Sequence, residues 1–272
     1  MARPFFYISS YSPGQQEIML DEDNSRHVIQ VLRMRPGEAL RLTDGKGALL
    51  DGVILDDHKK KCRVSIKAAI TEPPRTNRVT IAISPIKHTA RFEWFLEKAT
   101  EIGVSTIIPL LCERTERQSI RTDRLRNILV SAMLQSQQAW LPVLTEPTPF
   151  GQLLALMHAD GTHAGETRTG GTQSGGTHSV DFGAGQAYIA HLLEAPRATS
   201  SLAFVTREQP VPIAGPHAAR PGATILIGPE GDFSPKEVEA ALAANITPVS
   251  LGHNRLRTET AGIVAATLLC VQ

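Results

Sequence analysis

Residues 223–237 read Ala-Thr-Ile-Leu-Ile-Gly-Pro-Glu-Gly-Asp-Phe-Ser-Pro-Lys-Glu, which predicts a buried strand, a loop and a helix in direct succession. The first five residues have the apolar, largely branched side chains of a buried strand, and the segment from Gly228 to Phe233 interrupts them sharply. Ser234 and Glu237 form a capping box, with proline at the first helical position between them. The inward face of this helix is expected to consist of Val238, Ala241 and Leu242.

A second unit of the same kind follows directly. Residues 248–251 are expected to be a strand and residues 252–257 a loop. A helix over residues 259–269 comes next, with Thr258 as its cap. In open parallel sheets ligands bind beyond the carboxyl ends of the strands, and glycine permits a close approach of the backbone. We therefore expect the two units to stand side by side and their loops to form a binding site. Either loop alone would also fit a turn that needs glycine for its geometry.

Two strings, residues 227–234 and 251–261, resemble the carboxyl-terminal signatures of the RsmE family, the bacterial 16S rRNA uridine-N3 methyltransferases of the SPOUT superfamily. The likeness continues through residues 87–104 and through residues 135–136 with 141–142 downstream. It implies an α/β fold, in which a small PUA-like β-barrel domain precedes a trefoil-knotted, parallel-sheet methyltransferase domain. It also implies a homodimer that transfers a methyl group from S-adenosyl-L-methionine to N3 of a uridine in 16S rRNA of the small ribosomal subunit.

The resemblance assigns residues of this chain to three roles. An imide nitrogen must lose its proton to attack, so Arg257 is the candidate cation for a uracil oxygen, and Glu230 and Glu259 are candidate bases. Glu259 also suits the start of its helix, and Glu230 also suits a hydrogen bond within its own loop. The residues implied to bind the cofactor are Leu110, Ile227, Gly228, Pro229, Glu230, Gly231, Leu251, Gly252, Leu256, Arg257, Thr258, Thr260 and Ala261. The residues implied to bind RNA are Arg26, Arg33, Arg35, Lys87, Arg91, Arg114, Arg117, Gln135 and Ser136.

The composition is that of an ordinary globular protein of two domains. A chain of 272 residues exceeds one typical domain, and 42% hydrophobic with 20% charged residues can bury a core. Residues 1–72 are expected to form the β-barrel domain and residues 73–272 the methyltransferase domain. No bilayer-length apolar run or secretory signal is found, so a cytoplasmic location without membrane attachment is expected. The three cysteines have no paired spacing, which favours core positions over disulfides or a zinc site.

Positive charge gathers in one segment. The formal net charge is only +1, which does not indicate a nucleic-acid-binding protein by itself. Residues 114–126 nevertheless hold five arginines against two acidic residues, and the planar guanidinium suits phosphate. These arginines are Arg114, Arg117, Arg121, Arg124 and Arg126. The segment therefore predicts either a phosphate contact or an exposed helix face without a partner.

The amino-terminal part predicts a small β-rich domain. Strands are expected over residues 5–8, 38–43, 48–55 and 63–68, with a hairpin turn at residues 44–47. A short helix is expected over residues 21–34. Its inward side chains would be Val28, Val31 and Leu32, and its outward ones Arg26, Arg33 and Arg35. Prolines at 73 and 74 mark the end of this domain, which resembles the PUA-like domain that grips RNA in the family.

Strands and helices alternate in the rest of the chain, which predicts a parallel sheet covered by helices. Strands are expected over residues 79–84, 106–110, 187–190 and 202–205, and helices over residues 89–102 and 122–140. No glycine follows the strand at 79–84, which argues against the dinucleotide-type site of dehydrogenases and class I methyltransferases.

Two features depart from the family pattern. Leu134, Gln137 and Gln138 replace the charged and glycine residues usual beside Gln135 and Ser136, and Leu134 and Trp140 would suit packing or a dimer contact. Residues 158–186 are rich in Gly, Thr and Ser and predict a flexible insertion. Its histidines fit a solvated loop, with metal binding as the alternative. Two other functions remain open, namely a different SPOUT activity such as ribose 2′-O-methylation, and a non-catalytic ribosome-assembly factor.

Overall fold

The computed structural model describes residues 3–116, 120–161, 185–191, 200–201, 222–252 and 254–271. The chain forms two compact units, one of Met1–Pro74 with Leu129–Leu141 and one of Arg75–Ile128 with Pro142–Gln272. Helix α3 (Thr122–Gln135) gives its first half to the second unit and its second half to the first. Each unit is built around its own sheet, and the two are described separately.

The first unit contains a five-stranded sheet in the order β1-β3-β4-β5-β2. Its strands are β1 (Phe5–Tyr7), β2 (Glu17–Met19), β3 (Ala39–Thr43), β4 (Ala48–Asp56) and β5 (Arg63–Thr71). Alternate residues Leu40, Leu42, Leu50 and Val64 are fully buried, because successive side chains of a strand point to opposite faces. In the expected turn between β3 and β4, the Asp44 carboxylate accepts hydrogen bonds from the backbone N–H groups of Lys46 and Ala48. The short strand β2 was not predicted.

The helix of the first unit is shorter than predicted. An α-helix, α1 (Glu22–Arg26), continues directly into a π-helical turn, η1 (His27–Val31). A π-helix holds more residues per turn than an α-helix, so side chains after His27 no longer follow the α-helical spacing. Val28 is fully buried as expected, but Val31 is 66% exposed and Leu32 is 43% exposed. The prediction that these two face inward is therefore wrong.

The second unit contains an eight-stranded sheet in which every pairing is parallel. The order is β11-β13-β10-β12-β6-β7-β8, and β9 also pairs with β7. The strands are β6 (Val79–Ile83), β7 (Thr106–Leu111), β8 (Val143–Leu144), β9 (Thr148–Pro149), β10 (Gln186–Ala190), β11 (Ser200–Ser201), β12 (Ala223–Ile227) and β13 (Thr247–Ser250). Every residue of β6 is buried, which explains why it is apolar except for Thr80.

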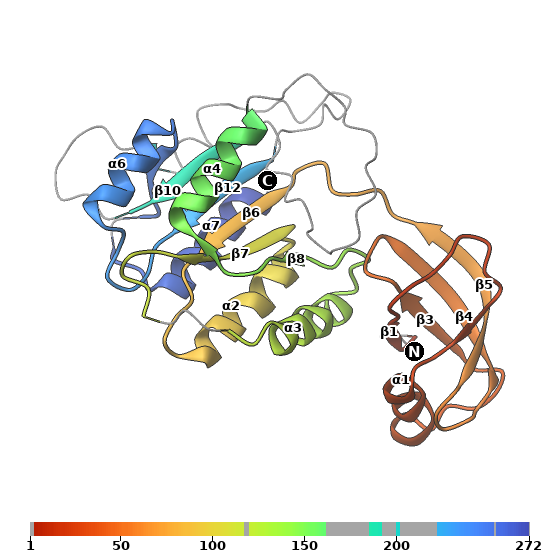
Figure 1. The fold of residues 1–272 in the computed structure, drawn as a ribbon. Helices are drawn as coiled ribbons and strands as arrows, with labels where there is room; N and C mark the ends of the chain where they lie inside the picture. The colour runs from red at the N-terminus through yellow and green to blue at the C-terminus, as the bar shows by residue number, and fades with distance from the viewer. Residues whose placement is uncertain are drawn as a thin grey trace. The chain divides into compact units, whose positions relative to one another are not determined.

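Helices cover both faces of this sheet (Figure 1). They are α2 (Thr89–Ile102), α4 (Phe150–Gly161), α6 (Pro235–Ala243) and α7 (Thr258–Cys270). One face carries α4 and α6, whose Phe150 and Ala241 share a core with Ile108 and Leu226. The other carries α2 and α7, which pack against each other. A Cβ atom at Gly262 of α7 would lie 2.6 Å from the Phe95 ring, so this helix pair needs glycine for its close approach.

The order of the strands differs from the expected one. We predicted that the units ending in the two glycine-containing loops, which follow β12 and β13, stand side by side. Instead β10 lies between these strands, with Ile189 paired to Leu226 of β12 and to Pro248 of β13. Local periodicity indicates that a strand exists but not which strands it pairs with. The site between the loops is therefore wider than expected and includes the end of β10.

Several smaller predictions are also settled by the structure. The capping box of α6 is confirmed, but Leu242 is 47% exposed and does not face inward. Helix α3 ends at Gln135 instead of residue 140, because Gln137 adopts a left-handed conformation with φ 57°. Cys62 and Cys112 are buried as expected, whereas Cys270 is only partly buried. Burial raises the pKa of the Cys62 thiol to about 11.

Some predictions cannot be compared with the structure. The strand expected at residues 202–205, His163, His178 and most of the expected insertion lie outside the described residues. His158 falls in α4, a helix that was not predicted. Within the described part of the chain, no helix combines the length and the apolar character needed to cross a membrane.

Candidate functional site

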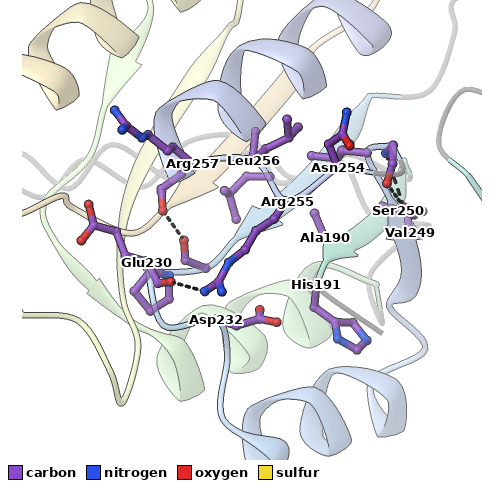
Figure 2. A pocket seen from close by; sticks show the side chains of 17 residues that line it. Ala190, His191, Glu230, Asp232, Val249, Ser250, Asn254, Arg255, Leu256 and Arg257 are labelled. Atoms are coloured by element: carbon purple, nitrogen blue, oxygen red, sulfur yellow. Dashed lines mark hydrogen bonds between the residues drawn. The ribbon is translucent and has the colours of Figure 1, made fainter. Parts of the chain in front are cut away.

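A pocket of about 360 Å³ lies at the carboxyl ends of β10, β12 and β13 (Figure 2). Two loops form most of its wall, a first loop of residues 228–233 after β12 and a second loop of residues 251–257 after β13. A volume of this size suits a small organic ligand. This is also the edge at which ligands bind to parallel sheets. We refer to it as the glycine-loop pocket.

The first loop is held in a compact turn. The backbone N–H of Asp232 donates to the Pro229 carbonyl at 2.9 Å, and Asp232 adopts φ 63°, a left-handed conformation. A Cβ atom on Gly228 would lie 3.0 Å from the Phe233 ring, so Gly228 lets this buried side chain fold back over the strand end. From outside the turn, Arg114 donates to the Gly231 carbonyl at 2.7 Å. On this side the loop is therefore fixed by packing and by Arg114.

In the second loop, glycine is required at position 252 for its backbone conformation. Gly252 has φ 135°, which side chains of L-residues rarely allow, and a Cβ atom built there has no heavy atom within 4 Å. The Ser250 hydroxyl donates to the Gly252 carbonyl at 2.9 Å and accepts from its backbone N–H at 3.3 Å. The backbone at Gly252 thus borders open space on the pocket wall, where a ligand can approach it closely.

Two hydrogen bonds join the loops across the site. The buried Thr258 hydroxyl donates to the Gly228 carbonyl at 3.2 Å, and the Arg255 guanidinium donates to the Glu230 carbonyl at 3.2 Å. Figure 2 shows Arg255 crossing the pocket, whereas the side chains of Arg257 and Glu230 point away from it. The predicted cap of α7 is wrong, because Thr258 is its first helical residue and is bonded to the first loop.

The amino-terminal end of α7 opens onto the pocket. Arg257 is its N-cap residue and makes no side-chain cap hydrogen bond. Its carbonyl accepts from the backbone N–H of Ala261 at 2.8 Å, so the N–H groups of residues 258–260 have no acceptor within the helix. These groups, with the partial positive charge of the helix end, suit polar or anionic atoms of a ligand.

Glu259 lies behind this helix end and is buried. Its side chain is 8% exposed, and its Oε1 lies 3.8 Å from Nε of Arg91 on α2. Its Oε2 is also buried and accepts no hydrogen bond from any described residue. Glu230, in contrast, is exposed. The two glutamates predicted as candidate bases therefore occupy very different surroundings.

The structure brings most of the predicted cofactor-binding residues together. The ten that line the pocket are Ile227, Gly228, Pro229, Glu230, Leu251, Gly252, Leu256, Arg257, Thr258 and Ala261. The other three do not line it. Leu110 is fully buried in the core under α4, Gly231 lies at the outer side of the first loop near Arg114, and Thr260 is an exposed residue of α7.

The predicted RNA-binding residues are scattered. Arg26, Arg33, Arg35, Gln135 and Ser136 belong to the first unit. Within it Arg26 pairs with Glu22, Arg35 pairs with Asp57, and the Ser136 hydroxyl donates to the Ala132 carbonyl.

The remaining predicted RNA-binding residues belong to the second unit. Lys87 pairs with Glu116 at 3.0 Å, and the Glu116 carboxylate raises the pKa of Lys87. Arg91 faces Glu259, and Arg114 supports the first loop. Arg117 lies outside the described residues.

Seven residues that line the pocket were not predicted. They are Ala190, His191, Asp232, Val249, Ser250, Asn254 and Arg255. Ala190 and His191 could not be predicted from the sequence, because β10 was not expected between β12 and β13. The other five lie within or next to the two loops, so including every polar residue of the loops would have found Asp232, Asn254 and Arg255. Among the described residues, no group of three or more His, Cys, Asp or Glu side chains is placed to hold a metal ion.

Comparisons with known proteins place the pocket within a recognised domain. Residues 72–270 match the family model of an RNA methyltransferase domain, and residues 20–67 match that of an RNA methyltransferase PUA domain. Ribosomal RNA small subunit methyltransferase E of Rickettsia conorii is 26% identical, over 95% of this chain and 91% of that protein. The protein of that name from Mycobacterium tuberculosis is 27% identical, over 97% of this chain and 90% of its own length.

Solved structures show the same relationship. A probable rRNA-methyltransferase from Porphyromonas gingivalis shares 38% sequence identity and a TM-score of 0.74, with 98% of both chains covered. A Legionella pneumophila structure in complex with S-adenosylmethionine shares 25% identity and a TM-score of 0.72, covering 99% of this chain and 97% of that chain. The likeness therefore extends over both units.

Proposed function

The chain belongs to the RsmE family of RNA methyltransferases, and we propose that it transfers the methyl group of S-adenosylmethionine to N3 of a uridine in 16S rRNA of the small ribosomal subunit. The observation that carries this proposal is the glycine-loop pocket, which lies entirely within the segment matched by the methyltransferase family model. The pocket supports a cofactor-dependent transfer, and the family supports the RNA substrate.

The residues of the pocket fit S-adenosylmethionine. Apolar side chains of Ile227, Val249 and Leu256 offer contacts for its adenine ring, and the amides at the start of α7 suit its polar atoms. The open space beside Gly252 leaves the backbone accessible at the place where any Cβ atom would project. When bound, S-adenosylmethionine supplies an electrophilic methyl group on a positively charged sulfur atom.

Glu230 is the better placed of the two candidate bases. Its exposed side chain stands at the edge of the pocket, where a uracil can approach it and transfer the N3 proton to its carboxylate. The Glu259 carboxylate is buried and faces Arg91, so a uracil cannot reach it unless α2 or α7 moves. In this proposal Glu259 fixes Arg91 and the start of α7, and it takes no proton.

Arg257 stabilises the negative charge of the deprotonated uracil. Its guanidinium is exposed and extends away from the pocket, in the same direction as Glu230 in Figure 2. A cation there can bind O2 or O4 of the uracil while N3 faces the methyl donor. Positioning by the two joined loops supplies the remaining acceleration.

The proposal includes a homodimer, as in the family. Leu134 and Trp140 were expected to suit packing or a dimer contact. Trp140 does not support the dimer, because its indole N–H donates to the Glu72 carbonyl of its own unit. Trp94 of α2 is 46% exposed and is the better candidate for such a contact. Light scattering at micromolar concentration tests this part, and a monomer would contradict it.

The experiment that tests the reaction compares 16S rRNA nucleosides from cells with and without this gene. We expect N3-methyluridine to be absent without the gene, and to appear when the purified protein and S-adenosylmethionine act on small subunits from those cells. A missing 2′-O-methylated nucleoside would instead favour the other SPOUT activity. Unchanged nucleosides, with no heat of S-adenosylmethionine binding in calorimetry, would favour a non-catalytic assembly factor.

A further inference from the structure

A second pocket, of about 410 Å³, opens between the first turns of α2 and the segment that leads into α3. We refer to it as the α2/α3 pocket. Its floor is apolar and includes Ile86, Phe92 and Leu125, of which Phe92 and Leu125 are each 2% exposed. Arg121 stands exposed among its lining residues. Its walls also include Thr89, Glu93 and Arg124. An apolar floor with polar walls and an exposed cation at the edge is not needed for the packing of two helices, so it suggests a ligand.

The α2/α3 pocket and the glycine-loop pocket each share lining residues with a third, small cavity. A small cavity of about 30 Å³ shares Pro85 and Ile86 with the α2/α3 pocket. The same cavity shares Pro229, Glu230 and Thr258 with the glycine-loop pocket. Glu230, the proposed base, therefore stands between the two pockets. An RNA strand whose uridine lies at Glu230 is therefore close to the α2/α3 pocket.

The charges around the α2/α3 pocket favour one kind of ligand. Arg124 is neutralised by Glu93 through two contacts, Nε to Oε1 at 2.7 Å and Nη2 to Oε2 at 2.9 Å. Arg121 takes part in none of the ion pairs found between described residues. One available guanidinium above an apolar floor suits a nucleotide, because the base is flat and largely apolar on its faces while the phosphate is anionic.

We propose that the α2/α3 pocket binds a nucleotide of the RNA next to the methylated uridine, with its base on the apolar floor and its phosphate at Arg121. Proteins that act on single-stranded RNA commonly hold unstacked bases in this way. The inference rests on the proposed function, since it assigns a second contact for the same RNA. It also gives three arginines of residues 114–126 different roles. Arg114 supports the first loop and Arg124 pairs with Glu93, whereas Arg121 contacts the RNA in this proposal.

Two variants and one matched control test this site on small subunits from cells without the gene. Arg121→Glu reverses the charge at the pocket, and Ala90→Trp fills the pocket from an exposed lining position without changing charge. Arg126→Glu makes the same charge change at an exposed α3 residue that does not line the pocket. We expect both pocket variants to raise KM for the subunits about tenfold relative to Arg126→Glu, as for loss of one stacked base. The affinity for S-adenosylmethionine, measured by calorimetry, should stay unchanged.

The outcomes distinguish this inference from the proposed function. If the native protein forms N3-methyluridine but Arg121→Glu and Ala90→Trp have the KM of Arg126→Glu, the proposed function stands and the nucleotide site is wrong. If the pocket variants change the mass in light scattering, the pocket is a contact between copies of the chain and the inference is overturned. If the native protein makes no N3-methyluridine at all, the proposed function is wrong, and the inference that rests on it is wrong with it.

Discussion

The guanidinium of Arg114 donates to the backbone carbonyl of Gly231 at 2.7 Å and to that of Phe233 at 3.4 Å. Both acceptors belong to the first loop, which forms one wall of the glycine-loop pocket. The neighbouring residue, Glu113, donates its backbone N–H to the Glu237 carboxylate at 2.8 Å. The segment after β7 is thus fastened to the first loop and to the start of α6, and we expect Arg114 to influence cofactor binding through the backbone of this loop.

Arg114→Ala should therefore weaken cofactor binding more than RNA binding. Hydrogen bonds from charged donors contribute about 1.5–3 kcal/mol, and the lower end applies to this partly exposed pair, which predicts about a tenfold rise in the Kd for S-adenosylmethionine. Arg114→Lys should be intermediate, since one ammonium can reach one carbonyl, and Arg126→Ala is the control. If calorimetry shows native cofactor affinity while RNA affinity falls, Arg114 is an RNA contact after all.

The two loop glycines should respond differently to substitution. Gly252→Val places its side chain in open space on the pocket wall at a strained φ, so we expect loss of S-adenosylmethionine binding and a fall in melting temperature that comes from backbone strain alone. Gly228→Val meets the buried Phe233 ring at about 3 Å, so it should lower the melting temperature as well. Thermal unfolding with and without cofactor measures both effects. A native melting temperature for Gly228→Val would show that the Phe233 contact yields at no cost.

Arg257→Ala should separate binding from turnover. Its guanidinium extends away from the pocket, so the cofactor affinity should remain close to native, whereas the single-turnover rate at saturating subunits should fall about a hundredfold, as for the loss of one oxyanion donor. Arg255→Ala is the comparison, because Arg255 joins the loops across the pocket and its loss should weaken cofactor binding. A native single-turnover rate for Arg257→Ala would remove this residue from the reaction.

Arg91→Ala should destabilise the second unit, because it leaves the buried Glu259 carboxylate without its cation. Arg91 is 38% exposed and the pair is 3.8 Å apart, so we expect a loss of about 1 kcal/mol in the free energy of unfolding, well below that for a fully buried pair. Adding Glu259→Gln to Arg91→Ala should recover part of this loss, since a neutral amide needs no cation. Denaturant unfolding of the single and double variants measures it. Full additivity of the two changes would mean that the residues do not interact.

Local structure was predicted well where the sequence carries a local signal. The bounds of α2 and β12 agree with those expected, and the capping box of Ser234 and Glu237 is present. The expected order of a PUA-like domain and a parallel-sheet methyltransferase domain is confirmed, while the trefoil knot stays a prediction. Helix α4 was missed although Phe150, Leu153 and Leu154 follow helical spacing.

Pairing over long distances could not be predicted. Crossover connections decide which strands are neighbours in a parallel sheet. The sequence of a short apolar strand such as β10 does not indicate where its crossover leads. The positions of Ala190 and His191 in the pocket follow from that pairing alone. Likewise, the hydrogen bonds from Arg114 and Arg255 to backbone carbonyls of the first loop leave no pattern in the sequence, because any residue offers a carbonyl. The proposed function and the candidate roles came from the family resemblance, and geometry distinguished exposed Glu230 from buried Glu259 as the candidate base.

The position of β10 between β12 and β13 also has a kinetic consequence. The pocket requires β10 to settle against two strands that come later in the chain, and β12 must in addition pair with the distant strand β6. Parallel pairings between such separated segments form slowly, because a long stretch of chain must be ordered before any contact is gained. During refolding from denaturant, the first unit with its hairpins should regain its structure early. Capacity to bind S-adenosylmethionine should return in the slowest phase, making ligand binding a reporter of the completed sheet.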